Sequence, residues 1–112
     1  MSKYLSKKVV VNGIKFDSKK EAKRYEELKS MQERGEISNL ELQVPYELIP
    51  SQKRNGKVIE RPCKYIADFR YIKDGETIVE DVKGYRQSTA YSVFKIKKKL
   101  MLYLNDIRVI EI

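Results

Sequence analysis

Two apolar runs joined by Asp74 and Gly75 are the feature that most restricts how this chain can fold. Residues 64–72 and 77–83 have the composition of core strands, and an Asp-Gly pair between two such runs is typical of a two-residue β-turn. Counting outward from a two-residue turn places Asp68 directly opposite Asp81. The sequence therefore predicts a hairpin in the core with two carboxylates that face each other across it.

Lys83 belongs to the same patch, because side chains two positions apart on a strand point to the same face. The two carboxylates repel by about 4 kcal/mol at roughly 4 Å and an effective dielectric constant of about 20. A divalent cation, a shared proton or both would relieve this repulsion. Carboxylate oxygens and a nearby main-chain carbonyl, such as that of Val82, suit Mg²⁺ or Mn²⁺. The alternative is a surface hairpin with scattered charges, and the apolar neighbours of Asp68 and Asp81 argue against it.

Two polar residues on neighbouring positions are candidates for the same site. Glu80 should face the opposite side of its strand, but a bulge in the hairpin would place it where Asp81 is expected. Gln43 lies on the polar face of a strand predicted over residues 40–49. It could reach between metal and substrate, or it could make an ordinary hydrogen bond on the sheet surface.

Glu21 is a third candidate, from a helix predicted over residues 18–34. It lies at the edge of the apolar stripe of that helix, which favours a place beside the buried site. Ser18 and Glu21 also match the S-x-x-E capping box, in which the glutamate side chain would close the helix start instead.

The whole chain, residues 1–112, fits one α/β domain. After an N-terminal hairpin the element order is α-β-β-β-α-β, which predicts a mixed central sheet flanked by a helix on each face. We expect residues 1–8 to be flexible. The remaining predicted elements are a hairpin over residues 9–16, a loop or exposed hairpin tip over 50–61, a helix over 88–104 and a strand over 107–112.

Lysine and arginine outnumber aspartate and glutamate by 24 to 16, which gives a formal charge of +8. Such an excess suggests a polyanionic partner, most simply nucleic acid, although a solvated basic surface is the plain alternative. The chain has no histidine and one cysteine, Cys63, so a histidine-based catalytic triad and a cysteine or histidine zinc site are excluded. No apolar run is long enough for a membrane span, and a reducing, cytoplasmic setting fits the single cysteine.

Basic residues gather in and before the second predicted helix. We expect them on its exposed side, where they would neutralise DNA phosphates without reading sequence, and a solvated helix face is the alternative. Lys53, Arg54 and Lys57 in the polar stretch after residue 50 could reach a groove. The predicted DNA-binding residues are Gln43, Arg86, Lys95, Lys97, Lys98 and Lys99, and the predicted apolar stripe of the helix is Val93, Ile96 or Phe94, Leu100, Tyr103 and Leu104.

The segments IADF and VEDVKG resemble the signature of the PD-(D/E)XK nuclease superfamily. The resemblance implies that Asp68 is the first acid and that Asp81, Val82 and Lys83 form the (D/E)-x-K element. Glu21 lies where many members carry a glutamate on an upstream helix. It further implies the α-β-β-β-α-β core of restriction-endonuclease-like proteins, with Glu21, Asp68, Asp81 and Lys83 as catalytic residues. The metal ligands that it implies are Glu21, Asp68, Asp81 and Val82.

A narrower resemblance covers nearly the whole chain from Val11 onward. The segments GIKFDSKKEAKRYEEL, LELQVPYELIP, YIADFRY and EDVKG resemble small phage and prophage nucleases that are similar to Holliday-junction resolvases. This implies metal-dependent cleavage of DNA, with branched or recombination DNA as the substrate class, inside a bacterial host cell. A homodimer would give paired cuts. The alternatives are a non-catalytic nucleic-acid-binding protein on the same fold, or a phage protein that binds a host factor.

Overall fold

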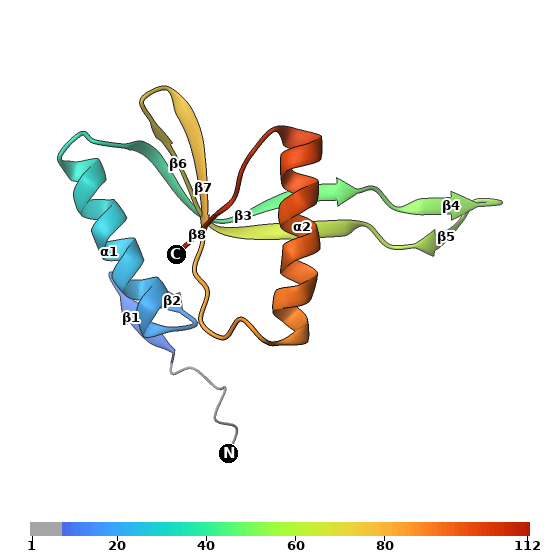
Figure 1. Ribbon diagram of the computed structural model, residues 1–112, viewed down its shortest axis with the longest axis horizontal. Helices are drawn as coiled ribbons and strands as arrows, with labels where there is room; N and C mark the ends of the chain where they lie inside the picture. Colours follow the sequence, from blue (N-terminus) through green and yellow to red (C-terminus); the bar gives the residue numbers. More distant parts are fainter. Residues whose placement is uncertain (1–7) are drawn as a thin grey trace, which may run out of the picture.

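The first element in the described part of the chain is a short antiparallel hairpin of β1 (Val9–Val11) and β2 (Ile14–Phe16), at the predicted place. The computed structural model describes residues 8–112, so all but the last residue of the expected flexible segment 1–8 lies outside the described part. In Figure 1 this hairpin lies against the start of the first helix. Phe16 at its end is 2% exposed and packs with Tyr25 of that helix.

The central sheet has four strands in the order β3-β6-β7-β8. The strands are β3 (Ser38–Ile49), β6 (Cys63–Lys73), β7 (Glu76–Asp81) and β8 (Ile110–Glu111). The first two pairings are antiparallel and the pairing of β7 with β8 is parallel, so the sheet is mixed as predicted. The protein is a small single-domain α/β fold.

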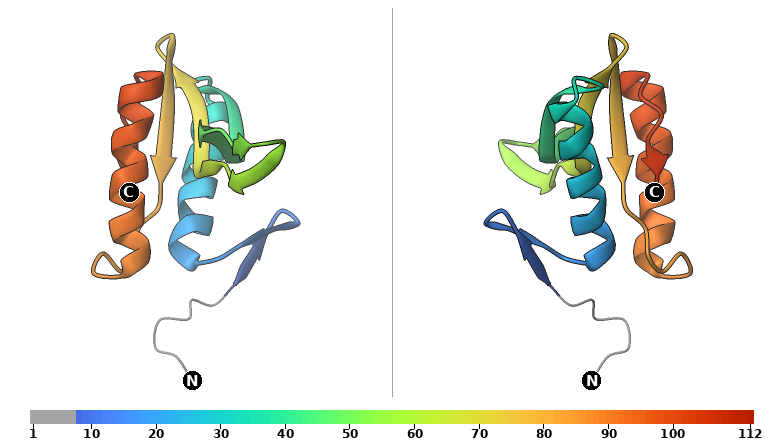
Figure 2. Two further views of the ribbon diagram at one scale, coloured as in Figure 1. Left: turned by 90° about the vertical axis from the view of Figure 1, so that its right-hand side faces the viewer. Right: turned by 90° about the vertical axis from the view of Figure 1, so that its left-hand side faces the viewer.

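Helices α1 (Lys19–Glu33) and α2 (Thr89–Asn105) each begin after a serine, whose side chain accepts a backbone hydrogen bond. They pack on opposite sides of β7, as Figure 2 shows. Glu80 of β7 pairs with α1, whereas Val79 belongs to the apolar cluster that contains Phe94 and Met101 of α2. A second cluster contains Leu28 of α1 together with Phe69 and Tyr71 of β6.

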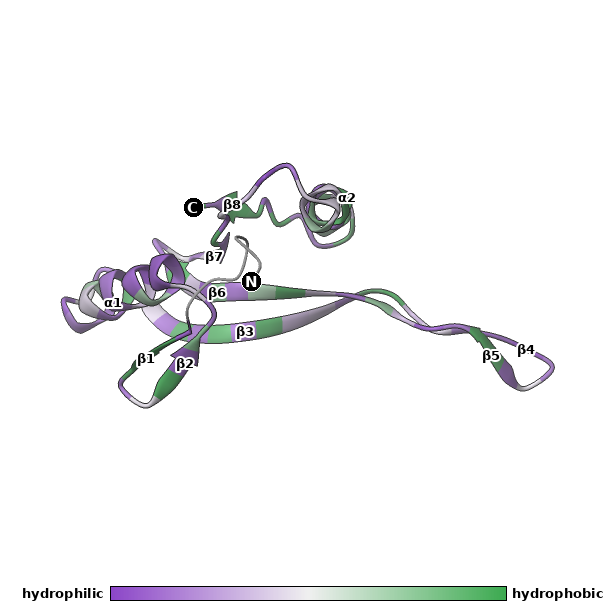
Figure 3. Cartoon of the chain, turned by 90° about the horizontal axis from the view of Figure 1, so that it is seen from below, coloured by the Kyte–Doolittle hydropathy of each residue, from purple (hydrophilic) through white to green (hydrophobic). Residues whose placement is uncertain are grey.

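A third hairpin lies where the sequence predicts a loop or an exposed hairpin tip. It consists of β4 (Gln52–Arg54) and β5 (Lys57–Glu60), and it lies between β3 and β6 in the chain. Figures 1 and 3 show it projecting away from the helices at the end of the long β3–β6 ribbon. The predicted loop or hairpin tip is therefore a hairpin, and it lies outside the packed body.

The predicted apolar stripe of α2 is largely wrong. Phe94 and Met101 are buried, whereas Val93, Ile96 and Tyr103 are exposed by 46%, 61% and 85%. Leu100 is half-buried and Leu104 is 47% exposed. The cause is that α2 carries apolar residues on more than one face. The face that packs against the sheet is the one that carries Phe94 and Met101. Periodicity alone cannot choose between two such faces.

Two strand ends also differ from prediction. The strand expected over residues 77–83 ends at Asp81, and the one expected over 107–112 is confined to Ile110–Glu111. The chain beyond β7 still follows its neighbour, because Lys83 N donates to Ile112 O at 3.1 Å. Among residues 8–112, no helix is long and apolar enough to cross a membrane.

Candidate active site

The register of the β6–β7 hairpin is the one that a two-residue turn predicts. Asp74 and Gly75 have φ values of 51° and 78°, and Phe69 pairs with Glu80. One further step along both strands sets Asp68 opposite Asp81. Asp68 Oδ2 accepts a hydrogen bond from Val82 N at 2.8 Å, which ties the first acid to the end of β7. A local turn thus brings the two acids together.

Asp81 lies at the end of β7 and is 6% exposed. Its Oδ2 accepts from Tyr65 Oη at 2.5 Å, and its Oδ1 lies 2.8 Å from Lys83 Nζ. The Lys83 ammonium also lies 3.6 Å from the ring centroid of Phe94, a cation–π distance. Lys83 therefore faces Asp81 as predicted, although it lies beyond the strand and is placed by this ion pair and the ring.

Glu21 serves the helix cap and the site with different atoms. Its backbone N donates to Ser18 Oγ at 3.1 Å, which caps α1. Its carboxylate accepts from Gln43 Nε2 at 3.2 Å, and the same nitrogen lies 3.3 Å from Asp68 Oδ1. Gln43 has a φ of 52°, in the left-handed region that few non-glycine residues adopt. The strained Gln43 backbone therefore lies where the amide bridges two carboxylates.

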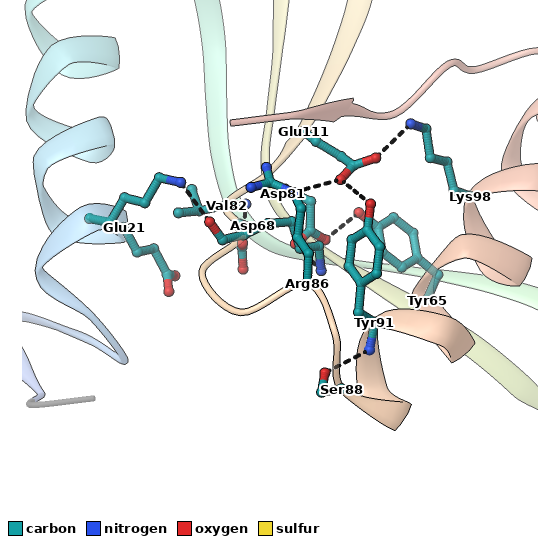
Figure 4. A network of polar contacts seen from close by, with 12 residues as sticks. Glu21, Tyr65, Asp68, Asp81, Val82, Arg86, Ser88, Tyr91, Lys98 and Glu111 are labelled. Carbon is teal, nitrogen blue, oxygen red and sulfur yellow. Dashed lines mark hydrogen bonds and ion pairs between the residues drawn. The ribbon is translucent and has the colours of Figure 1, made fainter. Parts of the chain in front are cut away.

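The three acids line one cavity of about 470 Å³. Glu21 comes from α1, Asp68 from β6 and Asp81 from β7, and the rim includes Val82 and Gly84. Figure 4 shows the Glu21 and Asp68 side chains extending toward the same space. One hairpin and a helix that is distant from it in sequence thus deliver carboxylates to one open cavity.

Burial and mutual repulsion alter the acidity of this cluster. The pKa of Glu21 rises from its ordinary 4.5 to about 7, first because of burial and then because of the charges of Asp68, Asp17 and Asp81. The pKa of Asp68 rises to about 6, again through burial first and Asp81 second. Burial and the neighbouring Asp81 also raise the pKa of the Tyr65 hydroxyl. The surroundings thus disfavour the full negative charge of the acids.

A hard divalent cation fits the donor chemistry of this cavity. Asp68 and Asp81 offer carboxylate oxygens, and Mg²⁺ keeps several waters, so two protein carboxylates are enough to hold it. Within residues 8–112 no group of three or more His, Cys, Asp or Glu side chains lies close enough to form a ligand set. Glu21 would therefore act at longer range, through water. The negative charge of the acids in the cavity favours the binding of a cation.

Glu80 lies outside this cavity, on the other side of β7. Both of its carboxylate oxygens accept from Arg24, at 2.7 Å from Nε and 2.6 Å from Nη2, and Tyr71 Oη donates to it as well. It is 1% exposed. Because the hairpin register is regular from Phe69 to Lys73, no bulge exchanges Glu80 with Asp81. Asp81 is the second acid of the site.

The basic residues predicted to bind DNA do not form one exposed row. Lys98 Nζ lies 2.8 Å from Glu111 Oε2, and Arg86 Nε lies 3.4 Å from Glu111 Oε1, so both face the end of β8. Lys97 is half-buried, and only Lys95 and Lys99 of the helical four are exposed. Figure 4 shows how Glu111 collects these contacts, with Tyr91 as a third donor.

Two residues of this region were missed by sequence reasoning. Tyr65 donates to Asp81, and Glu111 is the register partner of Asp81 on the parallel strand β8. Lys98 holds the pKa of Glu111 at about 2. The alternation of residues 107–112 could have indicated that Glu111 shares a sheet with Asp81. No local signal links Tyr65 to Asp81, because that contact depends on how the ribbon twists.

Comparison with curated proteins and with solved structures finds no match. One family model does match, over residues 1–110, and its description is "protein of unknown function". Its span includes every residue of the cavity described above. The chain therefore belongs to the DUF1064 family.

Proposed function

We propose that the protein is a metal-dependent DNA endonuclease that hydrolyses phosphodiester bonds. The observation that carries the proposal is the convergence of Glu21, Asp68 and Asp81 on one open cavity, with the Lys83 ammonium 2.8 Å from Asp81. A chain of charge +8 that only bound a polyanion would gain nothing from three carboxylates facing it. Carboxylates beside a phosphate make sense when a cation lies between them.

Each residue has a role that its contacts suggest. Asp68 and Asp81 would hold Mg²⁺ or Mn²⁺, with the Val82 carbonyl as a further oxygen donor. The bound ion would polarise a phosphoryl oxygen and lower the pKa of a water molecule. The Lys83 ammonium would stabilise the negative charge that develops on the phosphoryl group. Glu21, tied by Gln43 to Asp68, accepts the proton of the attacking water.

The reaction adds one water across one P–O bond. The water oxygen bonds to phosphorus while the bond to the bridging ester oxygen breaks. One water proton passes to Glu21, and the departing oxygen takes up a proton from solvent. The exposed Lys95 and Lys99 would neutralise flanking phosphates, and Arg86, Lys97 and Lys98 would do so only by leaving their present contacts.

The biological setting in this proposal follows the resemblance to phage and prophage nucleases. The enzyme would act in the cytoplasm of a bacterial host on branched or recombination DNA. A homodimer would place two sites on one substrate and give paired cuts. Sedimentation with and without a branched duplex would measure whether two copies assemble.

The test is nicking of supercoiled plasmid with Mg²⁺ or Mn²⁺. Wild type should nick, whereas Asp81→Ala and Lys83→Ala should lose activity by about 100-fold or more. Glu76→Gln is the matched control, because Glu76 lies exposed at the other end of β7. Absence of cutting by wild type on linear, supercoiled and branched DNA with either metal would exclude the enzyme. Equal cutting by Asp81→Ala would show that the site is misplaced.

A second candidate is a nucleic-acid-binding protein that does not cleave. It is favoured by the observation that Asp68 and Asp81 already have protein partners on all four of their carboxylate oxygens. Under this alternative wild type and Asp81→Ala bind duplex DNA equally, and Mg²⁺ changes neither affinity nor melting temperature. A melting temperature that rises with Mg²⁺ in wild type but not in Asp81→Ala would reject it.

A further inference from the structure

The projecting hairpin has no part in the site described above. Residues 50–62, which we call the arm, include β4 and β5 and connect β3 to β6. Every residue of the arm is exposed. Its turn is formed by Asn55 and Gly56, with φ values of 52° and 77°, and the strands pair on both sides of it with one register shift between Gln52 and Lys53, so the arm is a paired hairpin and not a loose loop. A paired hairpin whose residues are all exposed in the described chain needs another explanation.

Charge is concentrated on the arm. It carries Lys53, Arg54, Lys57 and Arg61, with Glu60 as its one acidic residue. Arg54 and Lys57 are register partners, so two like charges face each other directly beside the turn. Such a pair destabilises an isolated hairpin. The arrangement becomes favourable when an anion such as a phosphate lies between the two cations.

The arm also exposes apolar side chains. Val58 is 54% exposed and Ile59 is 53% exposed, and Figure 3 shows the hydrophobic colour of β5 beside the hydrophilic colour of β4. The B-DNA major groove, about 12 Å wide, admits a two-stranded β-ribbon, and its floor presents thymine methyl groups to apolar side chains. Exposed cations for the phosphates and exposed aliphatic groups for the groove floor are the two requirements of that binding mode.

We propose that the arm binds duplex DNA by lying in its major groove, at a distance from the acidic cavity. The proposal rests on the proposed function in that DNA is the substrate. Strand β6 runs directly from Asp68 back to the arm, and about 12 extended residues separate Asp68 from the turn, a reach of up to roughly 40 Å. That reach corresponds to about twelve base pairs, slightly more than one helical turn. The arm therefore requires intact duplex on one side of the cut.

The test measures binding in EDTA, where no cleavage interferes. The arm variant is Lys53→Ser with Arg54→Ser and Lys57→Ser, which keeps the turn. The control variant, Lys15→Ser with Lys23→Ser and Lys73→Ser, removes the same charge from exposed positions elsewhere. On a duplex of about 25 base pairs, the arm variant should bind at least about tenfold more weakly, and its slope of log affinity against log salt should fall by about 2 to 3. The control should change both by much less.

Duplex length provides the second measurement. Shortening the duplex to about 10 base pairs removes the DNA under the arm, so wild type and arm variant should converge in affinity. If the triple variant fails to fold, Lys57→Ser alone should lower the salt slope by about 0.9. Equal affinity and slope for wild type and arm variant on the long duplex overturn the proposal. So does a loss of self-association in sedimentation without a loss of DNA affinity, which would assign the arm to a second copy.

The two proposals fail in different ways. If wild type never cleaves but the arm-dependent salt slope is present, the endonuclease is wrong and the arm stands. If plasmid is cleaved in an Asp81-dependent manner but the arm variant binds like wild type, the arm is wrong and the endonuclease stands. Tighter binding of single-stranded RNA than of duplex DNA, dependent on the arm, also overturns the groove assignment.

Discussion

Two hairpins of this protein have the same turn geometry and opposite surroundings. The β6–β7 hairpin turns at Asp74 and Gly75, and the arm turns at Asn55 and Gly56, with nearly equal φ values. Each also holds a pair of like charges across its two strands. In β6–β7 the pair is acidic, with Asp81 buried and Asp68 half-buried, whereas in the arm it is basic and fully exposed.

The difference between the hairpins shows what burial does to a like-charge pair. Burial and the neighbouring charge of Asp81 raise the pKa of Asp68 to about 6, and burial and the nearby acids raise that of Glu21 to about 7. The exposed bases are screened by water and salt, so their repulsion is small. Neither pair stabilises the fold. In the proposed function each pair has a partner of opposite charge, a metal ion for the acids and the DNA phosphates for the bases.

The largest effect is expected when one acid of the Asp68–Asp81 pair is replaced. Asp68→Asn should reduce cleavage by about 100- to 1,000-fold, because one of the two metal-holding carboxylates is lost. Asp74→Asn is the matched control, since it makes the same chemical change in the exposed turn of the same hairpin, where asparagine is well tolerated. Plasmid nicking with Mn²⁺ measures both. Equal activity of the two variants would remove Asp68 from the site.

The second-largest effect concerns a buried carboxylate that does have an ion-pair partner, Glu80. Arg24→Ala should destabilise the protein by about 3–5 kcal/mol, because it leaves the buried Glu80 without its ion pair. Arg70→Ala is the control: Arg70 pairs with the exposed Glu41, and its loss should change stability by less than about 1 kcal/mol. Urea unfolding measures both. Similar losses for the two variants would show that burial does not make the Arg24–Glu80 pair costlier to break.

A third experiment uses pH to sharpen the comparison. The folded-state pKa of Glu21 is about 7, above its ordinary 4.5, so the folded protein binds this proton more tightly. Stability from this group is therefore full below about pH 4.5 and declines as pH rises toward 7. Glu21→Gln should raise the melting temperature at pH 7.5 by about 4–8 °C for each kcal/mol relieved, and much less at pH 4.5.

Glu26→Gln on the exposed side of α1 is the control for this pH experiment and should change little at either pH. Adding Mg²⁺ at pH 7.5 should raise the melting temperature of wild type more than that of Glu21→Gln. A melting temperature that falls for Glu21→Gln at pH 7.5 would show that its carboxylate stabilises the fold.

The smallest effect is expected for substitutions that exchange the charges beside the two turns. Lys73 and Glu76 flank the core turn with opposite charges, where Arg54 and Lys57 flank the arm turn with like charges. Lys57→Glu should protect the arm amides from hydrogen exchange by about 0.2–1 kcal/mol while it weakens duplex binding. Glu76→Lys should lower the protection of its own turn by a similar amount. Unchanged exchange in both variants would reject cross-strand repulsion as a feature of the arm.

Much of the fold followed from local sequence signals. The hairpin over residues 9–16, the Asp74-Gly75 turn, the helix starts at Ser18 and Ser88 and the order of the core elements appear as predicted. Turns and caps are decided within a few residues, so their signals are complete in the sequence. The packed face of α2 was not predictable, because helical periodicity allows either Phe94 or Ile96 to be buried. Only packing against the sheet decides that Phe94 is the buried one.

The sequence by itself determined that Asp68 and Asp81 face each other, because a two-residue turn fixes the register of everything beyond it. It likewise determined the excess of positive charge. Only the tertiary structure decided that Glu21 reaches the pair through Gln43, that Glu111 holds Lys98 and that the arm projects into solvent. These outcomes depend on how separate elements pack, and packing is a balance of burial and charge over the whole chain that no local pattern contains.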